Sequence, residues 1–374
     1  MKGFLNILVS LLLFSSVSYA QLNNYTNSEK IITAVPFILI SPDARTSSMG
    51  NAGVAVPINS NSSGENVAKT AFLDENSGFS ITYIPWLNTL VNDRKLMYVT
   101  GFHKLSKRST LSSSLKYLSY GQFDLTDNSL IDRGTVRPNE YVADIGISRN
   151  FGPAFSIGTN VKFIHSNLYS VEGTNVQVQG GNAFAVDISS FHRIDISSVS
   201  KPMSLGLSLN ILNIGPKMSY YYNSEKKFFL PTMFKIGSSL AIGEEEDSQF
   251  ILALDLNKLL VPSSQKLSSE NETLIEPSVL TGMINSFSDS KEGFKGEIAE
   301  LGVSIGAEYS YQRKIFFRAG YNYQNIQKGD GSFISMGLGL KYKMIGFDLS
   351  YLRGNPQQTF LSNTLRFTIG YSFL

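Results

Sequence analysis

Three histidines are the side chains of this chain that could serve as a general base near neutral pH: His103, His165 and His192. If the chain spans a membrane, a phospholipase-type hydrolase would need one of them beside a serine and a polar orienting group, close to the end of the protein at the cell surface. Only His165 would then lie near that end, in a row of side chains that faces lipid. An interfacial histidine is the ordinary interpretation of such a position. The sequence therefore predicts no catalytic residue and no enzymatic activity.

Metal chemistry and nucleic-acid binding are also poorly supported. The chain has no cysteine, which excludes thiolate metal sites and disulfides. The run EEED, from Glu244 to Asp247, lacks the alternating ligand spacing of a calcium loop and is typical of a solvated turn. A net charge of +2 gives no polybasic surface for nucleic acid. We expect no metal, no other cofactor and no nucleic-acid partner.

Charged residues instead occur one at a time within segments in which apolar and polar residues alternate. MSLGLSLNIL, from Met203 to Leu212, is one such segment, and a period of two indicates a strand with two different faces. Fourteen segments share this pattern: 79–85, 95–104, 110–120, 140–149, 154–165, 182–193, 203–213, 232–242, 249–259, 300–311, 314–323, 332–343, 345–352 and 364–374. No helical period appears, apart from a possible short helix after Asn66.

The polar face of these segments indicates a confined lumen. Its charges are six bases and five acids: Lys116, Asp144, Lys162, Asp187, Lys235, Asp255, Glu308, Arg318, Lys341, Asp348 and Arg366. Glycine and serine fill the positions between them, whereas a soluble sheet surface would favour Thr, Lys and Glu, because glycine weakens strands. The aliphatic face would then meet lipid, and a closed barrel satisfies every backbone group there.

The linkers between segments support the same fold. They are mostly short after even-numbered segments and longer after odd-numbered ones, as in outer-membrane barrels with periplasmic turns and extracellular loops. We therefore predict an all-β fold, a transmembrane outer-membrane β-barrel of 14 antiparallel strands. A soluble β-sandwich is the alternative.

Three regions follow from this interpretation. Residues 1–20 have the charged start, apolar run and small residues of a signal peptide cleaved after Ala20, which predicts export to the outer membrane. Residues 21–78 do not alternate, and we expect an N-terminal plug in which Asp43 and Arg45 pair with lumen charges. A periplasmic arm is the alternative. Residues 79–374 form the transmembrane barrel.

Aromatic residues in the expected extracellular loops are candidate partner-binding residues. Tyr220, Tyr221, Tyr222, Phe228 and Phe229 surround a charged run, and could form a docking surface or an aromatic girdle at the lipid boundary.

Two further loop features are candidates for contact with a partner. Trp86, the single tryptophan, and Leu87 could anchor at the interface or contact a partner. The loop from Leu260 to Glu300 is polar, but its segment PSVLTGMINSF is apolar enough to dock.

The first hundred residues carry a family resemblance. ITAVPFILISPDARTSSMGNAGVAV, NVAKTAF and GFSITYIPWLNTLVND resemble the start of the PorV family, the FadL-like outer-membrane proteins of the type IX secretion system in the Bacteroidetes. Two stretches depart from the family pattern. Thr46-Ser47-Ser48 replaces small Ala and Gly, and Glu65-Asn66-Val67 replaces Trp-Asn-Pro, which removes an aromatic residue and a helix-starting proline.

The resemblance implies a FadL-like barrel with an N-terminal plug and a non-enzymatic role in protein secretion. It implies that cargo with a type IX C-terminal signal domain is collected at an SprA-type translocon and handed to the PorU sortase and attachment complex. The rival hypothesis is a FadL-type outer-membrane channel for hydrophobic small molecules. The mostly small, polar and charged lumen disfavours a large apolar pocket.

Overall fold

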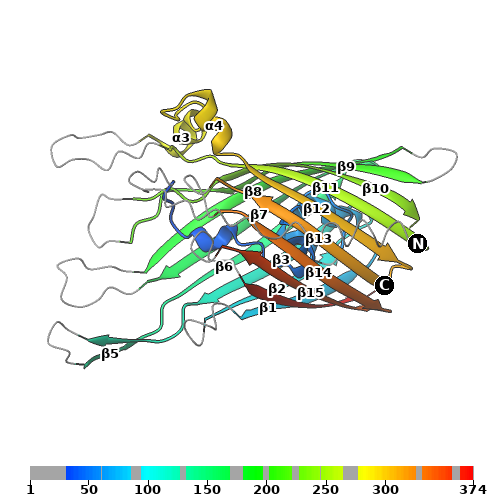
Figure 1. Ribbon diagram of the computed structural model, residues 1–374, viewed down its shortest axis with the longest axis horizontal. Coiled ribbons are helices and arrows are strands. Elements are labelled where there is room, and N and C mark those ends of the chain that lie inside the picture. Colours follow the sequence, from blue (N-terminus) through cyan, green and yellow to red (C-terminus); the bar gives the residue numbers. More distant parts are fainter. Residues whose placement is uncertain are drawn as a thin grey trace, which may run out of the picture.

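The computed structural model describes residues 31–59, 61–85, 94–126, 132–168, 180–196, 202–220, 227–244, 246–263, 277–325, 331–355 and 363–373. Within these ranges, fourteen antiparallel strands close into one barrel, which confirms the predicted fold class (Figure 1). Closure joins the first and last strands, with Ser77 opposite Phe373 and Ile81 opposite Ile369. The signal peptide, Trp86, Leu87, Tyr221 and Tyr222 lie outside the described residues.

The barrel strands follow the predicted segments closely. Their bounds are β1 Ser77–Pro85, β2 Lys95–Lys104, β3 Ser109–Ser119, β6 Asn139–Asn150, β7 Phe155–Asn167, β8 Gly181–Asp195, β9 Met203–Ile214, β10 Met233–Glu244, β11 Ser248–Leu259, β12 Gly302–Tyr311, β13 Ile315–Tyr323, β14 Phe333–Tyr342, β15 Ile345–Gly354 and β16 Thr364–Phe373. Sequential strands are neighbours, as expected for an up-and-down barrel, and β1 begins two residues before the segment predicted to start at 79.

The two ends of the barrel differ. Connections such as 312–314 and 343–344 are tight turns, whereas 215–232 and 260–301 are long. We call these the short-turn end and the long-loop end, and the last strand finishes at the short-turn end, where Figure 1 marks the C-terminus. A β4–β5 hairpin, Phe123–Thr126 with Asp132–Val136, extends from the long-loop end and was not predicted.

The two faces of each strand meet different surroundings. In β9, Leu207 and Leu209 are 38% and 41% exposed, whereas Ser208 and Asn210 are buried inside the barrel. The leucine row therefore faces outward, where the bilayer lies, and the serine and asparagine row faces the lumen. This is the orientation that the alternating pattern predicted.

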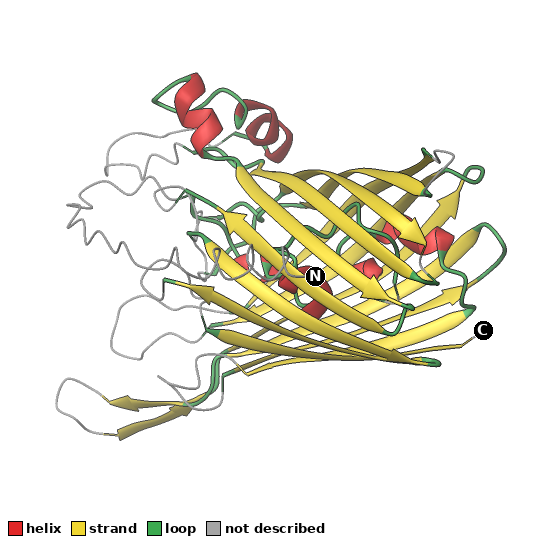
Figure 2. Ribbon diagram, turned by 45° about the vertical axis from the view of Figure 1, so that its right-hand side comes forward, coloured by secondary structure: helices red, strands yellow, loops and turns green. Residues whose placement is uncertain are grey.

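Residues 34–59 and 61–76 fold inside the barrel as a plug, which Figure 2 shows as helices and loops enclosed by the strands. Its helical elements are η1 Pro36–Leu39, α2 Ala44–Ser48, η2 Ser62–Gly64 and η3 Val67–Phe72. The helix expected after Asn66 is η3, and it forms without a proline because the Asn66 side chain accepts a hydrogen bond from Ala68 N–H (2.9 Å).

Two helices in the loop between β11 and β12 were not predicted: α3 Val279–Asn285 and α4 Phe294–Ala299. Both are too short for a 3.6-residue period to stand out in a sequence window. Ser278 is the N-cap residue of α3, and its side chain accepts a hydrogen bond from Thr281 N–H (3.2 Å). Among the described residues, no helix has the length and apolar character needed to cross a membrane.

Candidate functional site

The plug is joined to the barrel wall by a buried chain of alternating charges. Arg45, on α2, donates from Nε and Nη2 to the two carboxylate oxygens of Glu308 on β12, each at 2.8 Å. Glu308 also accepts from Arg318 on β13, and Arg318 reaches Asp348 on β15 (2.6 Å). Two cations and two anions thus alternate, which offsets the cost of removing each charge from water.

Asp43 has a different role from the one expected. Its carboxylate accepts hydrogen bonds from Thr46 N–H and the Thr46 hydroxyl, both at 2.9 Å, and from the Asn61 amide (2.9 Å). These partners belong to the plug itself. Asp43 therefore caps the N-terminus of α2 and joins two plug segments, while Arg45 makes the contact with a lumen charge.

Backbone groups of the plug bind further lumen side chains. Gly53 N–H and Val54 N–H both donate to the Asp255 carboxylate, at 2.8 and 3.0 Å. The Arg366 guanidinium bonds to the Ser41 carbonyl and the Ser47 hydroxyl. Asp255 and Arg366 are lumen charges in the sequence pattern, but the pattern did not indicate that their partners would be plug backbone.

The small residues of the lumen make room for the plug. A Cβ on Gly320 would lie 2.1 Å from Gly50 N and from the Met49 carbonyl carbon, and one on Gly306 would lie 2.6 Å from Met49 O. A methyl group at either position would collide with the plug backbone. Glycine is therefore required here by close contact between two parts of the chain, which is more specific than the predicted tolerance of a lumen for small residues.

Lys69 was not predicted as a site residue, although it belongs to the stretch NVAKTAF that carries the family resemblance. It is buried in the plug, and its ammonium donates to the carbonyls of Gly53 (2.7 Å) and Val56 (3.4 Å). Burial, together with the nearby Arg45 guanidinium, lowers the pKa of Lys69 to about 8. Lys69 thus joins η3 to the plug loop that contains Gly53 and Val56.

At the long-loop end, predicted partner-binding residues pack against the start of the plug. Ala34 N–H donates to Phe229 O (2.8 Å), and Val35 N–H donates to the Tyr220 hydroxyl (3.0 Å). Phe229 is buried, whereas Tyr220 and Phe228 are partly buried and pack against a hydrophobic cluster that includes Ala34, Val35 and Phe37 of the plug. Partner binding by these residues stays a prediction, and their observed contacts are with the start of the plug and with neighbouring loop residues of the same chain.

Two cavities flank the plug. The smaller, of about 150 Å³, lies toward the long-loop end, and its lining includes Ile38, Glu65, Tyr98, Lys116 and Lys235. The larger, of about 940 Å³, opens at the short-turn end, and its lining includes Arg45, Phe72, Arg193, Glu308 and Lys341. Both linings mix apolar groups with charges of both signs, unlike the mostly apolar pockets typical of hydrophobic ligands.

His165 and His103, two of the candidate general bases, lie on the outer face of the barrel. His165 Nδ1 lies 2.7 Å from Asn182 Oδ1, and its ring packs beside Tyr141 on the outer face of the barrel. His103 Nδ1 lies 2.7 Å from Ser77 Oγ, also on the outer face, and neither residue lines the two cavities described above. Ser77 and His103 are thus adjacent, but neither lines either of the two cavities described above.

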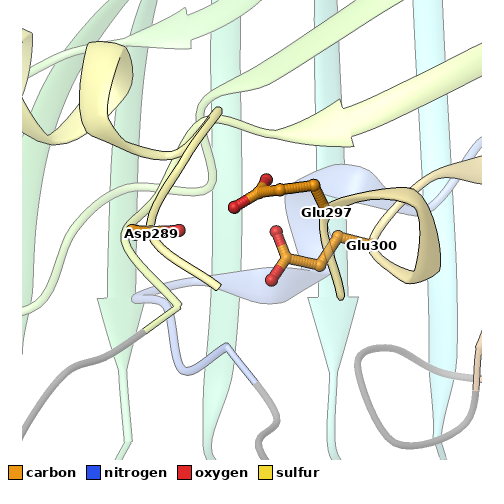
Figure 3. Close-up of side chains that lie close together, drawn as sticks. All are labelled: Asp289, Glu297 and Glu300. Carbon is orange, nitrogen blue, oxygen red and sulfur yellow. The ribbon is translucent and has the colours of Figure 1, made fainter. Parts of the chain in front are cut away.

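Three carboxylates in the β11–β12 loop lie close together. Ligand atoms of Asp289, Glu297 and Glu300 are within 4.8 Å of one another, and Figure 3 shows their side chains converging. The Lys258 ammonium binds Glu297 (2.9 Å) and Glu300 (2.7 Å), while Asp289 accepts from Ser263 N–H (2.8 Å). Lys258 thus supplies one positive charge to Glu297 and Glu300, while the Ser263 backbone holds Asp289.

A closed up-and-down barrel with lipid-facing apolar rows and a charged, plugged lumen defines a class: an outer-membrane β-barrel. Residues 23–266 match the family model described as Type IX secretion system protein PorV. The chain belongs to this family, whose members are outer-membrane components of type IX secretion.

Several solved structures are similar to the chain. A mutant of TodX, a Pseudomonas putida monoaromatic hydrocarbon channel, has a TM-score of 0.50 and 11% identity, over 88% of this chain and 97% of that one. The Ralstonia pickettii toluene transporter TbuX has a TM-score of 0.48 and 10% identity, over 88% and 98%. A Pseudomonas aeruginosa FadL homologue has a TM-score of 0.43 and 11% identity, over 90% and 99%. A comparison with curated protein sequences found no match.

Proposed function

We propose that this chain is a non-enzymatic carrier of type IX secretion, which binds the C-terminal signal domains of secreted proteins at the translocon and delivers them to the surface attachment complex. The observation that carries the proposal is the family match over residues 23–266, which includes the whole plug. The partners would be an SprA-type translocon, cargo with a C-terminal signal domain, and the PorU sortase. Outer-membrane lipid surrounds the barrel.

The orientation follows from the usual arrangement of such barrels. With the short-turn end in the periplasm, the long-loop end faces the cell surface, where exported cargo and the attachment complex act. The signal peptide, cleaved after Ala20, would direct the chain to this membrane. Our candidate contacts for a partner are the residues that the sequence singled out: Trp86, Leu87, Tyr220, Tyr221, Tyr222, Phe228 and Phe229. Of these, the structure describes Tyr220, Phe228 and Phe229, which lie at this end.

The rival function, a FadL-type channel for hydrophobic molecules, has less support. Its fold is the same, but a channel of this kind needs an apolar binding pocket. The cavity toward the long-loop end is small and includes Glu65, Lys116 and Lys235 in its lining.

Crosslinking mass spectrometry on native outer membranes, with affinity purification of the full chain, tests the carrier function. Because the chain has no cysteine, one introduced cysteine can carry a photo-crosslinking label at a single position. A label at exposed Lys227, beside Phe228, is compared with a label at Met344 in a short turn. We expect cargo signal domains and a very large translocon barrel to be captured at position 227 and not at position 344. Purification that recovers neither, from cells with active secretion, would contradict the proposal.

A further inference from the structure

Lys258 is a lysine in the lipid-facing row of β11, yet it is buried. Leu252, Leu254 and Leu256 of the same row are 45%, 42% and 37% exposed, whereas Lys258 is 4% exposed. Its ammonium is covered by Glu297 and Glu300 of the α4 region, at 2.9 and 2.7 Å. The α4 region therefore lies over the outer wall of the barrel, on the side that faces the bilayer.

A second contact places α3 beside the same wall. Phe287, just after α3, packs edge-on against Phe234, with ring centroids 6.4 Å apart, and Phe234 belongs to the outward row of β10. Gly282 of α3 faces the rim, since a Cβ there would lie 2.9 Å from the Phe229 ring. In Figures 1 and 2 the two helices accordingly project sideways from the long-loop end.

The outer surface of this helical hairpin is apolar. Leu280 and Ile284 are 66% and 72% exposed, and the spacing i, i+4 puts them on one face of α3, opposite Gly282. Phe287, just after the helix, is 54% exposed. Phe294 and Ile298 of α4 have the spacing i, i+4 and are 80% and 51% exposed. We call these five exposed side chains of the β11–β12 loop the hairpin apolar face, since large exposed apolar groups of this kind mark interaction sites.

We propose that the hairpin apolar face is embedded in the membrane interface beside the barrel, as an in-plane lipid anchor for the β11–β12 loop. The occupant is the acyl-chain region of the adjacent leaflet, because the patch continues the lipid-facing rows of β10 and β11 through Phe234 and Lys258. The exposed bases Lys291 and Lys295 suit the anionic headgroups at that depth. This anchor would fix the height and tilt of the long loop relative to the bilayer.

Site-directed spin labelling of the full chain in lipid vesicles tests the anchor. Since the chain has no cysteine, Ile284→Cys and Phe294→Cys each give one nitroxide site, and both side chains are exposed, so the fold is kept. Asn285→Cys and Lys295→Cys are matched controls, one residue further and turned by about 100° on the helix. Collision rates with oxygen, which concentrates in lipid, and with a water-soluble nickel chelate are measured at each site.

We expect several-fold higher ratios of oxygen to nickel collision at 284 and 294 than at 285 and 295. Equal, water-like ratios at all four sites would overturn the proposal. So would labels at 284 and 294 that are water-exposed in vesicles but shielded in native outer membranes, because that result would identify a protein as the occupant.

Discussion

At the scale of single residues, the charge chain from Arg45 to Asp348 is the contact on which plug docking depends most. Glu308 is its centre, since it is buried and accepts hydrogen bonds from both guanidinium groups. Losing one member leaves its partners charged, buried and incompletely paired, which is far more costly than losing an exposed ion pair.

Glu308→Gln should therefore lower the free energy of unfolding by about 3 kcal/mol or more. Urea unfolding of the folded barrel in detergent micelles measures the change. Glu246→Gln is the matched control, because the Glu246–Arg313 pair is exposed on both sides. Equal unfolding midpoints for the two variants would show that the charge chain does not hold the plug.

Lys69 gives a pH dependence with a defined sign. Its pKa falls from 10.5 to about 8 on folding, so between these pH values the unfolded chain holds a proton that the folded chain lacks. The free energy of unfolding should consequently rise with pH through this window, because the cost of burying the charged amine disappears.

The measurement for Lys69 is a comparison with Lys69→Met from pH 7.5 to 10.5. The difference in unfolding free energy, wild type minus variant, should increase as the pH rises. A flat difference would mean that Lys69 remains charged in the folded state throughout.

At the scale of elements, the contact between the plug and strand β13 depends on the absence of a side chain. Gly320→Ala should push the plug away from the wall, because its methyl would overlap Gly50 and Met49 of the plug. Limited proteolysis of the plug segment should become faster. Gly346→Ala, whose methyl would meet open space in the lumen, is the control and should behave as the wild type. Equal protection in both variants would contradict the close contact.

Lys258 provides the charged contact between the α3–α4 hairpin and the barrel wall. Hydrogen bonds from Lys258 and Ser290 N–H outweigh partial burial and lower the pKa of Glu297, which keeps this carboxylate charged. Lys258→Gln should loosen the hairpin, since two carboxylates lose their countercharge. Amide hydrogen exchange in residues 279–299 should accelerate, while exchange in the barrel strands stays unchanged. Arg313→Gln, at an exposed pair, should leave the hairpin protected.

At the scale of the whole molecule, the plug should close the barrel to small solutes. Residues 44–50 are buried between the walls and touch β13 to β16, and the two cavities lie on either side of the plug. Vesicles containing the wild-type chain should release a trapped sugar no faster than empty vesicles. Gly320→Leu should speed release by displacing the plug. Rapid release through the wild type would contradict a closed lumen and favour the channel function.

The sequence by itself determined the barrel. The alternation of apolar and polar residues indicates which face of each strand meets lipid, and this pattern is local to each strand. Leu207 and Ser208 can therefore be assigned to the lipid face and the lumen face from their neighbours in the sequence alone. Short linkers then fix antiparallel neighbours, and the PDAR and AKTAF stretches identified the family. The β4–β5 hairpin and α3 and α4 were missed, because elements of four to seven residues carry too little periodicity.

Only the tertiary structure decided the partners of the charged and glycine residues. Glu308 pairs with Arg45 across 263 positions of sequence, and Gly320 is required by a plug backbone that is equally remote. In the sequence, Lys258 resembles any other strand residue. Its burial on the outer wall beneath the α4 region depends on how the long β11–β12 loop folds back over the barrel. Such contacts arise from the packing of separate segments in space, and local spacing in the chain contains no information about them.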